Sequence, residues 1–280
     1  MGKNEEFNDL INFVETSSSL NKVKKKKQKR IVILLLNIIS ISLLIIGGYG
    51  LKSISDTKKD LEEAKALEEK LAKDMEKAQK NTPKKEEKDS EEETLVENPT
   101  YTDLHTQNQD FVGWIKVNST GVDLPVVHTD NNEFYLTHDF NKNWNSMGWV
   151  FADYRNTFPN LSKNTILYGH TYRDTIMFST LSRVLTNDWR ANESNHYITF
   201  NTLYKDIQWQ VFSIYTLEAT NDYLLTDFET DSDYEYFLNF IKSRSKYNFN
   251  VDVTTDDKIL TLSTCYIDGN HRLVVHAKML

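Results

Sequence analysis

The strongest feature of the hydrophobic pattern is a long apolar segment near the N-terminus. Residues 31–51 carry no charge, and only Asn37, Ser40 and Ser42 interrupt their run of mainly Ile and Leu. A membrane-spanning helix needs about 20 apolar residues, so this segment predicts one transmembrane helix. A cleaved signal peptide is the alternative, but its apolar core is only about 7 to 15 residues long. It also ends at a small-residue cleavage site, which the Gly-Gly-Tyr-Gly of residues 47–50 matches poorly, so we expect a retained anchor that crosses once.

A cluster of basic residues directly precedes this segment and predicts its orientation. The cluster consists of Lys22, Lys24, Lys25, Lys26, Lys27, Lys29 and Arg30. Positive residues beside a span are held on the cytoplasmic side of the membrane. We therefore expect residues 1–30 to form a cytoplasmic tail, and the chain from residue 52 onward to lie outside the cell.

Residues 52–94 combine many charges with an apolar residue at every third or fourth position of their first part. The apolar positions are Leu61, Ala64, Leu67, Leu71, Met75 and Ala78. This spacing places them on one face of a helix, and Glu and Lys neighbours can pair at i,i+4. A stable coiled coil needs about three or four clean heptads, so a helical stalk is the favoured interpretation. Residues 84–93 are typical of a charged, solvated linker.

The pattern changes after residue 94, where short apolar runs alternate with Asn, Asp and Gly turns. Strands are predicted at residues 111–117, 123–128, 148–152, 165–168, 197–200, 207–217, 259–264 and 272–278. Two segments, residues 177–189 and 231–247, are predicted to be helical. Many short strands with few helices predict a mainly β domain over residues 95–280, a barrel or sandwich with helical insertions.

Charge and composition narrow the class of protein. The formal net charge is −8, and the main basic run is on the predicted cytoplasmic side, so the outer part offers no basic patch for nucleic acid. We exclude nucleic acid as a partner. A composition rich in Lys and Asn and poor in Pro favours a bacterial cell-surface protein.

Cys265 is the one cysteine among 280 residues, so it forms no intrachain disulfide. It is either a buried apolar residue or a reactive nucleophile. A nucleophile needs a partner that handles protons and a group that stabilises the developing oxyanion. His170 follows the predicted strand at residues 165–168, and Arg272 opens the strand after Cys265, where a hairpin would bring the two together. A surface histidine and a solvated edge arginine are the alternatives for these two residues.

Side-chain alternation along the last two strands adds two neighbours of this group. Ser263 lies on the same strand face as Cys265, and His276 on the same face as Arg272. Packing within the fold is the favoured interpretation for both Ser263 and His276.

Motifs for metals and cofactors are missing from the sequence. There is no Cys-x-x-Cys, no His-x-x-x-His, no Gly-x-Ser-x-Gly and no phosphate-binding glycine loop. Asp252, Asp256 and Asp257 are interpreted as an ordinary acidic turn rather than a calcium site. We expect neither a metal nor a cofactor.

Three separated motifs resemble the sortases, membrane-anchored cysteine transpeptidases of Gram-positive bacteria. They are Leu-Tyr-Gly-His ending at His170, Thr-Leu-Ser-Thr-Cys ending at Cys265, and His-Arg-Leu-Val-Val around Arg272. The resemblance extends over about residues 95–280. Phe-Val-Gly-Trp-Ile at residues 111–115, Leu-Pro-Val-Val at 124–127, Gly-Trp-Val-Phe-Ala-Asp at 148–153 and the predicted helix at 231–247 are similar to class B sortases.

This resemblance implies an eight-stranded sortase β barrel with a defined chemistry. Cys265 would be the nucleophile, His170 the general acid and base, and Arg272 the cation that positions the substrate and stabilises the oxyanion. The candidate substrate-binding residues are Ser263, Thr264 and Tyr168. The implied substrates are secreted proteins with a C-terminal sorting pentapeptide, which form a thioacyl intermediate and pass to an amine of a peptidoglycan precursor.

Two other functions compete with a class B role. The Asn-His-Arg-Leu-Val-Val at residues 270–275 also resembles sortases that polymerise pilins, although those commonly carry a second span and a lid that the sequence does not show. The acceptor amine distinguishes these two roles. A surface receptor that binds peptides without catalysis, with Cys265 buried, is the alternative from a different class.

Overall fold

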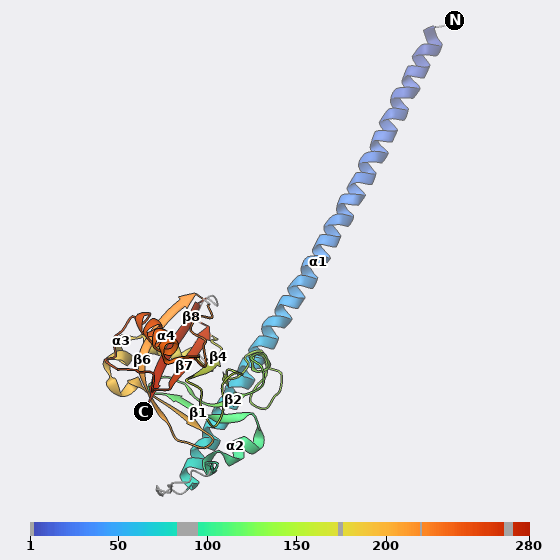
Figure 1. Cartoon of the computed structure of the whole chain (residues 1–280). Coiled ribbons are helices and arrows are strands. Elements are labelled where there is room, and N and C mark those ends of the chain that lie inside the picture. Colours follow the sequence, from blue (N-terminus) through green and yellow to red (C-terminus); the bar gives the residue numbers. More distant parts are fainter. Residues whose placement is uncertain (1–2, 83–94, 173–175, 219, 266–270) are drawn as a thin grey trace. The chain divides into compact units, whose positions relative to one another are not determined.

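The computed structural model describes residues 3–82, 95–172, 176–218, 220–265 and 271–280. Eight strands close into a barrel in the order β1-β2-β3-β4-β7-β8-β6-β5 (Figure 1). The strands are β1 (Phe111–Val117), β2 (Asp123–His128), β3 (Phe151–Ala152), β4 (Asn164–Gly169), β5 (Tyr197–Thr202), β6 (Gln208–Glu218), β7 (Ile259–Cys265) and β8 (His271–Met279). The expected mainly β, eight-stranded barrel is confirmed.

Two of the strand pairs are parallel, and these determine where the strand ends meet. Strand β2 runs parallel to β3, and β4 runs parallel to β7, whereas the other neighbours are antiparallel. Buried side chains alternate with more exposed ones along β5, as expected for a strand with one face on the core. The interior of the barrel is filled by large apolar side chains, among them Trp149, Phe200 and Trp209.

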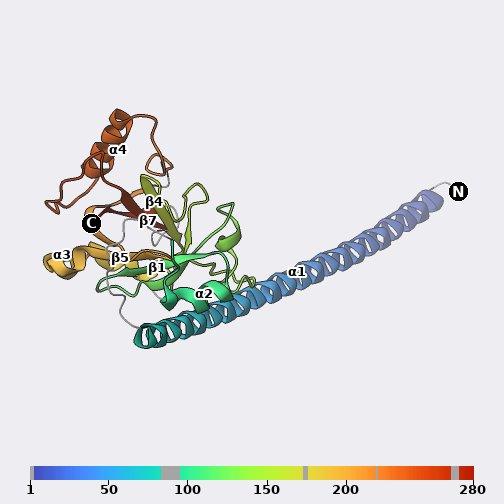
Figure 2. The ribbon, with the colours of Figure 1, turned by 60° about the horizontal axis from the view of Figure 1, so that its bottom comes forward.

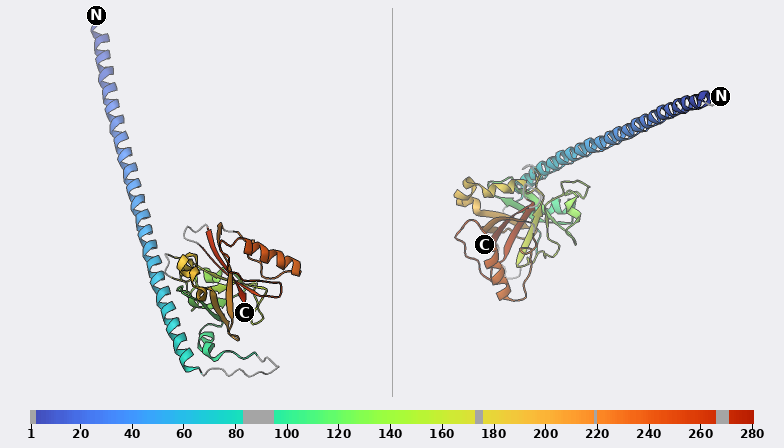
Figure 3. Two further views of the ribbon diagram at one scale, coloured as in Figure 1. Left: turned by 90° about the vertical axis from the view of Figure 1, so that its left-hand side faces the viewer. Right: turned by 90° about the horizontal axis from the view of Figure 1, so that it is seen from above.

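Helix α4 (Asp231–Ser243) covers the outside of the barrel at β6 and β8 (Figure 3). Thr230 caps its N-terminus by accepting a hydrogen bond from the backbone of Asp233. Its apolar face packs in a second cluster with β6, β7 and β8, formed by Tyr234, Phe237, Leu238 and Ile241 with Phe212, Ile259 and Val274. The predicted helix at residues 231–247 is therefore present and ends four residues earlier than expected.

The second predicted helix, at residues 177–189, is not continuous. Residues in this region form the 3₁₀ helix η3 (Ser179–Leu185) and then the short helix α3 (Asn187–Ala191). Thr186 separates the two in an extended conformation, and its side chain accepts a hydrogen bond from the Trp189 backbone, so it starts a new helix. The prediction of one helix was wrong because this capping residue interrupts the apolar period.

Short helical turns complete the fold. They are η1 (Pro99–Tyr101), α2 (Thr102–Gln107), η2 (Phe134–Leu136) and η4 (Glu193–His196). Of these, η2 is the one that borders the pocket described below.

Helix α1 (Lys3–Asn81) contains the apolar segment at residues 31–51. It is long and apolar enough to cross a membrane, as judged by length and composition. The chain divides into two compact units, Met1–Lys58 and Lys59–Leu280, so the last part of α1 belongs to the same unit as the barrel.

The apolar stripe on residues 59–81 of α1 packs against the barrel. Ala64, Leu71 and Met75 are buried in the main core cluster, which also contains Leu104 of α2. Figure 2 shows α2 beside this end of α1. At the start of the stretch, Asp60 accepts a hydrogen bond from the Ser146 hydroxyl at 2.6 Å. We expected a stalk apart from the barrel domain. The structure differs because the apolar stripe packs against apolar residues of the barrel in the same chain.

A buried polar network joins β4, β6, β7 and β8 inside the fold. Thr261 donates to the side chain of Asn164 at 2.7 Å and contacts His276 Nδ1 at 2.8 Å, while His276 Nε2 lies 2.8 Å from the Tyr215 hydroxyl. The Thr261 hydroxyl directs its proton to Asn164, so His276 Nδ1 donates and Nε2 accepts from Tyr215. Burial lowers the pKa of His276 to about 3, so it is neutral. The expected packing of His276 is confirmed.

Candidate active site

Three strand ends that carry chemically useful residues meet at one edge of the barrel. In the parallel pair of β4 and β7, Gly169 lies beside Thr264, so the following positions are His170 and Cys265. In the antiparallel pair of β7 and β8, Cys265 lies directly across from Arg272. The backbone register therefore brings the positions of the predicted nucleophile, base and cation together, although β4 is about 95 residues from β7 in the sequence.

The end of β4 is held tightly against its surroundings. The Thr264 hydroxyl donates to the Gly169 carbonyl at 2.8 Å. Gly169 itself has no room for a side chain, because an added Cβ would lie 2.6 Å from the ring of Phe178. The Phe178 backbone N–H also donates to the His170 carbonyl at 3.1 Å. These contacts fix the backbone from which His170 projects.

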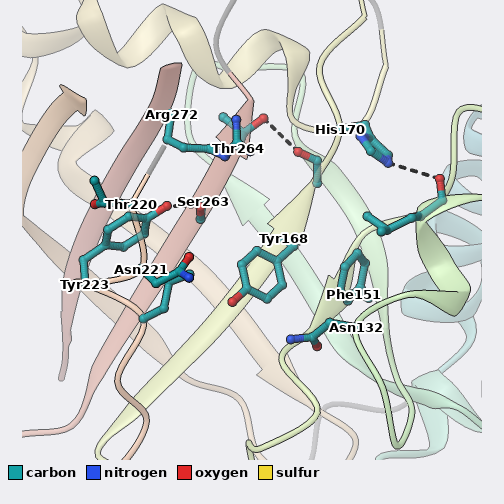
Figure 4. Close-up of a pocket in the computed structure, with 13 residues that line it drawn as sticks. Asn132, Phe151, Tyr168, His170, Thr220, Asn221, Tyr223, Ser263, Thr264 and Arg272 are labelled. Carbon is teal, nitrogen blue, oxygen red and sulfur yellow. Dashed lines mark hydrogen bonds between the residues drawn. The ribbon is translucent and has the colours of Figure 1, made fainter. Parts of the chain in front are cut away.

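The imidazole of His170 has a defined tautomer in this structure. Its Nε2 lies 3.1 Å from the backbone carbonyl oxygen of Leu136 in η2 (Figure 4). A carbonyl oxygen can only accept, so Nε2 carries the proton and donates. In the neutral ring, Nδ1 is then the atom that can take up a proton.

The surroundings of His170 favour its neutral form. Burial lowers the pKa of His170 below its ordinary value of 6.5, and the positive charge of Arg272 lowers it further. The hydrogen bond to Leu136 acts in the opposite direction and raises this pKa without restoring it. His170 is therefore a neutral base at pH 7.

Arg272 is half-buried at the start of β8 and lines the same pocket as His170. Its Nη1 donates to the backbone carbonyl of His271 at 3.2 Å. The side chain of Cys265 lies outside the described residues, so its orientation and exposure remain predictions.

A pocket of about 470 Å³ opens beside these residues (Figure 4). Its lining combines aromatic rings with amides and hydroxyls. It comes from β3, β4, β7, β8 and η2, and from the segments before η2, after β4 and after β6. The lining residues are Asn132, Leu136, Phe151, Tyr168, Gly169, His170, Thr220, Asn221, Tyr223, Leu224, Ser263, Thr264 and Arg272. An apolar pocket with a few convergent polar groups is typical of a site that binds a peptide or small molecule.

All three candidate substrate-binding residues line this pocket. The Ser263 hydroxyl lies 2.9 Å from the hydroxyl of Tyr223. The Thr264 hydroxyl donates its hydrogen bond to the Gly169 carbonyl. The hydroxyl of Tyr168 donates to Asp153 at 2.7 Å, which leaves its ring as a surface of the pocket. Their contact with a substrate remains a prediction.

Several lining residues were not singled out from the sequence. Asn132 lies in a polar run, Thr-Asp-Asn-Asn-Glu, that is typical of a loop, and Tyr223 lies in the segment between β6 and α4. Aromatic and amide residues in such segments give no periodic signal. The repeated Asn at residues 131–132 was the available hint of a turn that bonds its own backbone.

No group of three or more His, Cys, Asp or Glu that could hold a metal is found in the part of the chain that the structure describes. In the acidic turn, Asp257 lies 3.1 Å from Lys278 and its carboxylate also accepts from the Thr254 backbone at 2.7 Å. Asp252 lies 4.0 Å from Lys242. Asp257 thus forms an ion pair and a hydrogen bond within the turn, and Asp252 forms an ion pair.

Comparison with known proteins identifies relatives over the barrel. The protein-family model for the sortase domain matches residues 115–280. Sortase B of Staphylococcus aureus is 40% identical over 185 residues, which cover 65% of this chain and 75% of that protein. Sortase B of Listeria monocytogenes is 34% identical over 183 residues, which cover 64% of this chain and 73% of that protein.

The solved structures agree with the sequence comparison. The Staphylococcus aureus sortase B–substrate complex superimposes with a TM-score of 0.68 and 35% identity, and the match covers 79% of this chain and 98% of that one. Sequence similarity and similarity of fold thus indicate the same family. The chain therefore belongs to the sortase family of cysteine transpeptidases and resembles its class B members.

Proposed function

We propose that this protein cleaves the C-terminal sorting signal of secreted proteins and transfers them to an amine of a peptidoglycan precursor. Cys265 is the nucleophile, His170 the general acid and base, and Arg272 the cation beside the reacting carbonyl. The observation that carries the proposal is the strand register, in which Gly169 pairs with Thr264 and Cys265 pairs with Arg272 at one end of the barrel.

The reaction has two halves that share one thioester. The Cys265 thiol gives its proton to His170, and the sulfur attacks a backbone carbonyl carbon of the sorting signal, so that the carbonyl oxygen gains negative charge. Collapse breaks the C–N bond, and the leaving amine takes a proton from protonated His170. The acceptor amine then attacks the thioester and gives a proton to His170, the C–S bond breaks, and the released Cys265 thiolate takes that proton back from His170.

The charges around the pocket support these roles. His170 is neutral when the enzyme is free, so the thiolate and imidazolium pair is either a minor species or forms when the substrate binds. The guanidinium of Arg272 favours both the thiolate and the oxyanion, because each carries negative charge. Its planar donors can also hold a peptide carbonyl.

Similarity to class B enzymes supports a cell-wall acceptor over pilin polymerisation. Related sortase B enzymes have been solved as a substrate complex and in complex with triglycine, a peptide that carries an amine. We infer that this chain likewise takes a sorting-signal peptide and an amine acceptor at the pocket that His170 and Arg272 line.

The membrane anchor fits this chemistry. We infer that residues 1–30 are cytoplasmic, that residues 31–51 cross the cell membrane once, and that the barrel is extracellular, since basic residues precede the apolar segment. Residues 52–94 would lead from the span to the catalytic barrel of residues 95–280, and the part at residues 59–81 packs against that barrel. Enzyme, substrate and acceptor would then share one surface, which raises their effective concentration.

Peptide cleavage and adduct formation test this function directly. The full chain in detergent is incubated with a library of sorting pentapeptides, and mass spectrometry follows the thioacyl adduct. We expect an adduct on the wild type and none on Cys265→Ala. His170→Ala should lower kcat by about 100-fold or more, because a general acid and base commonly contributes that much.

His196→Ala provides the matched control. His196 bonds the Arg190 carbonyl at 3.0 Å and is not among the residues that line the pocket, so turnover should be unchanged. An adduct on Cys265→Ala, or normal turnover by His170→Ala, would remove the assigned residue from the mechanism.

A further inference from the structure

Asp153 is a fully buried carboxylate just after β3 that accepts hydrogen bonds from two residues of the pocket lining. It accepts five hydrogen bonds. They come from the Asn132 amide at 3.1 Å, the Tyr168 hydroxyl at 2.7 Å, and the Arg155 backbone N–H, Nε and Nη2 at 3.0, 2.8 and 2.7 Å. Asp153 is not itself among the residues that line the pocket.

Two of these donors come from the two segments that hold the His170 ring, one that carries it and one that accepts its hydrogen bond. Tyr168 lies two positions before His170 on β4, and Asn132 lies four positions before Leu136, whose carbonyl accepts from His170. Asn132 is also fixed by the Tyr154 backbone N–H, which donates to its side-chain oxygen at 2.9 Å. Asp153 therefore connects the segment that carries the imidazole to the segment that accepts its hydrogen bond.

The carboxylate stays ionised in this position. Burial by itself raises the pKa of Asp153, but the hydrogen bonds and charge of Arg155 and the Tyr168 hydroxyl outweigh burial and lower the pKa to about 2. A charged acceptor forms stronger hydrogen bonds than a neutral one, so the Tyr168 and Asn132 contacts are firm.

We propose that Asp153 is a positioning residue, which joins Tyr168 to Asn132 and thereby sets the distance between His170 and the Leu136 carbonyl. This inference rests on the proposed transpeptidase function. Asp153 acts through its neighbours and touches no reacting atom. Because it fixes the base rather than a peptide contact, its loss lowers kcat more than it changes KM.

Asp153→Asn is the primary variant, because it keeps the shape of the side chain and removes the charge. We expect kcat for peptide cleavage by the full chain to fall by about tenfold, as is common for the loss of a hydrogen bond to a charged group. KM should change by less than about threefold on the same reasoning. An unchanged kcat would overturn the proposal.

Asn195→Ala controls for a general loss of stability. Asn195 is buried, accepts from the Ser119 hydroxyl at 2.7 Å and donates to the Trp189 carbonyl at 3.0 Å, and it is not among the residues that line the pocket. Its replacement should lower the Tm and leave kcat of the folded enzyme unchanged. If it lowers kcat as much as Asp153→Asn does, the effect is not one of positioning.

Tyr168→Phe removes the hydroxyl that donates a hydrogen bond to Asp153, and it keeps the aromatic ring that lines the pocket. This variant should lower kcat by several-fold. If Asp153→Asn fails to fold, Tyr168→Phe tests the proposal in its place. In the double variant the two effects should overlap, so kcat stays within about threefold of Asp153→Asn alone. If the fold-reductions in kcat of the two single variants multiply in the double variant, the two residues act independently, and the proposal is contradicted.

Hydrogen exchange gives a measurement that needs no activity. Amides in residues 131–137 should exchange faster in Asp153→Asn than in the wild type, while those of β5 should not change. Unchanged exchange in residues 131–137 would overturn the positioning role. A wild type that fails to cleave any peptide would instead contradict the proposed function, so the two failures are distinguishable.

Discussion

His170 lies between an acceptor and a cation that act on its pKa in opposite directions. The Leu136 carbonyl stabilises the protonated ring, whereas Arg272 and the buried surroundings destabilise it. The ring is therefore neutral at pH 7 in the free protein. In the proposed mechanism it takes up a proton during the reaction and gives it to the leaving amine.

Arg272→Gln should raise the pKa of His170. The substitution removes a positive charge that disfavours imidazolium, so the midpoint moves up toward the ordinary value of 6.5, while burial keeps it below that value. NMR titration of the His170 ring protons measures the shift.

Arg244→Gln is the control for this titration. Arg244 forms a two-point ion pair with Asp222 at 2.6 and 2.8 Å and does not contribute to the His170 shift. A His170 midpoint that is the same in Arg272→Gln and Arg244→Gln would contradict the assigned influence of Arg272.

The residues with the clearest sequence signals were those next to strand ends. Cys265, His170 and Arg272 were predicted as catalytic because each adjoins a recognisable apolar strand within a family motif. Asp153 ends the Gly-Trp-Val-Phe-Ala-Asp motif, but no role was predicted for it, because an Asp after a short strand resembles any turn residue. Its proposed role depends on Asn132 and Tyr168, and their proximity is a property of the folded chain.

Among the elements, helix α1 is hydrogen-bonded to the segment that follows His170. Glu68 accepts a hydrogen bond from the Met177 backbone N–H at 2.8 Å. Met177 has a positive φ of 49°, a conformation in which a residue other than glycine needs support from its surroundings. Burial raises the pKa of Glu68 from 4.5 to about 7, so the folded state prefers its protonated form.

The sign of this shift gives a stability prediction for Glu68→Gln. The folded state holds the Glu68 proton more tightly than the unfolded chain, so stability is lost as pH rises from 4.5 to about 7. The variant lacks this loss, so it should match the wild type below pH 4.5 and be more stable above pH 7. Urea unfolding of residues 59–280 across this range measures the difference.

Glu69→Gln is the matched control on the same turn of α1. The Glu69 side chain is 74% exposed and lies 4.0 Å from Lys73, a geometry that contributes little to stability. Its unfolding curves should follow those of the wild type at every pH. The same gain from both substitutions would refute a specific effect of Glu68.

Strand prediction succeeded where short apolar runs are bounded by turn residues. The runs at residues 111–117 and 123–128 coincide with β1 and β2, and most residues of both strands are buried. The stripe on α1 had the right period, but periodicity does not tell which surface covers it. The covering surface is formed by residues such as Leu104 that are distant in sequence from Leu71.

At the scale of the molecule, the compact unit begins at Lys59 rather than at residue 95. Removal of residues 59–94 would expose the apolar surface that α1 buries. A fragment of residues 59–280 should therefore be more stable than a fragment of residues 95–280. Leu71 and Met75 each contribute about 1.5–3 kcal/mol when fully buried, so we expect a difference of about 3–6 kcal/mol.

Chemical unfolding of the two fragments measures this difference. A third protein, residues 59–280 with Leu71→Ala, should fall between them, because it keeps the helix and loses one anchor. Equal stability of the 59–280 and 95–280 fragments would show that the helix contributes nothing to the fold.

Closure of the barrel was implied by the family resemblance more than by the residues. Strand patterns alone left a barrel or a sandwich open, because both bury alternate side chains. The order β4-β7-β8 depends on pairing across long separations, such as Ile166 with Thr261, which no local pattern encodes.

The Thr261 and His276 pair has a practical consequence for redesign. These residues lie opposite each other, four positions from Cys265 and Arg272 on the same two strands. A slip of one residue would turn His276 to the other face and break its bonds to Thr261 and Tyr215, so the alignment of β7 with β8 is encoded within the strands. The pairing of Cys265 with Arg272 therefore depends on contacts inside the two strands, and redesign elsewhere should keep it as long as Thr261, His276 and Tyr215 are retained.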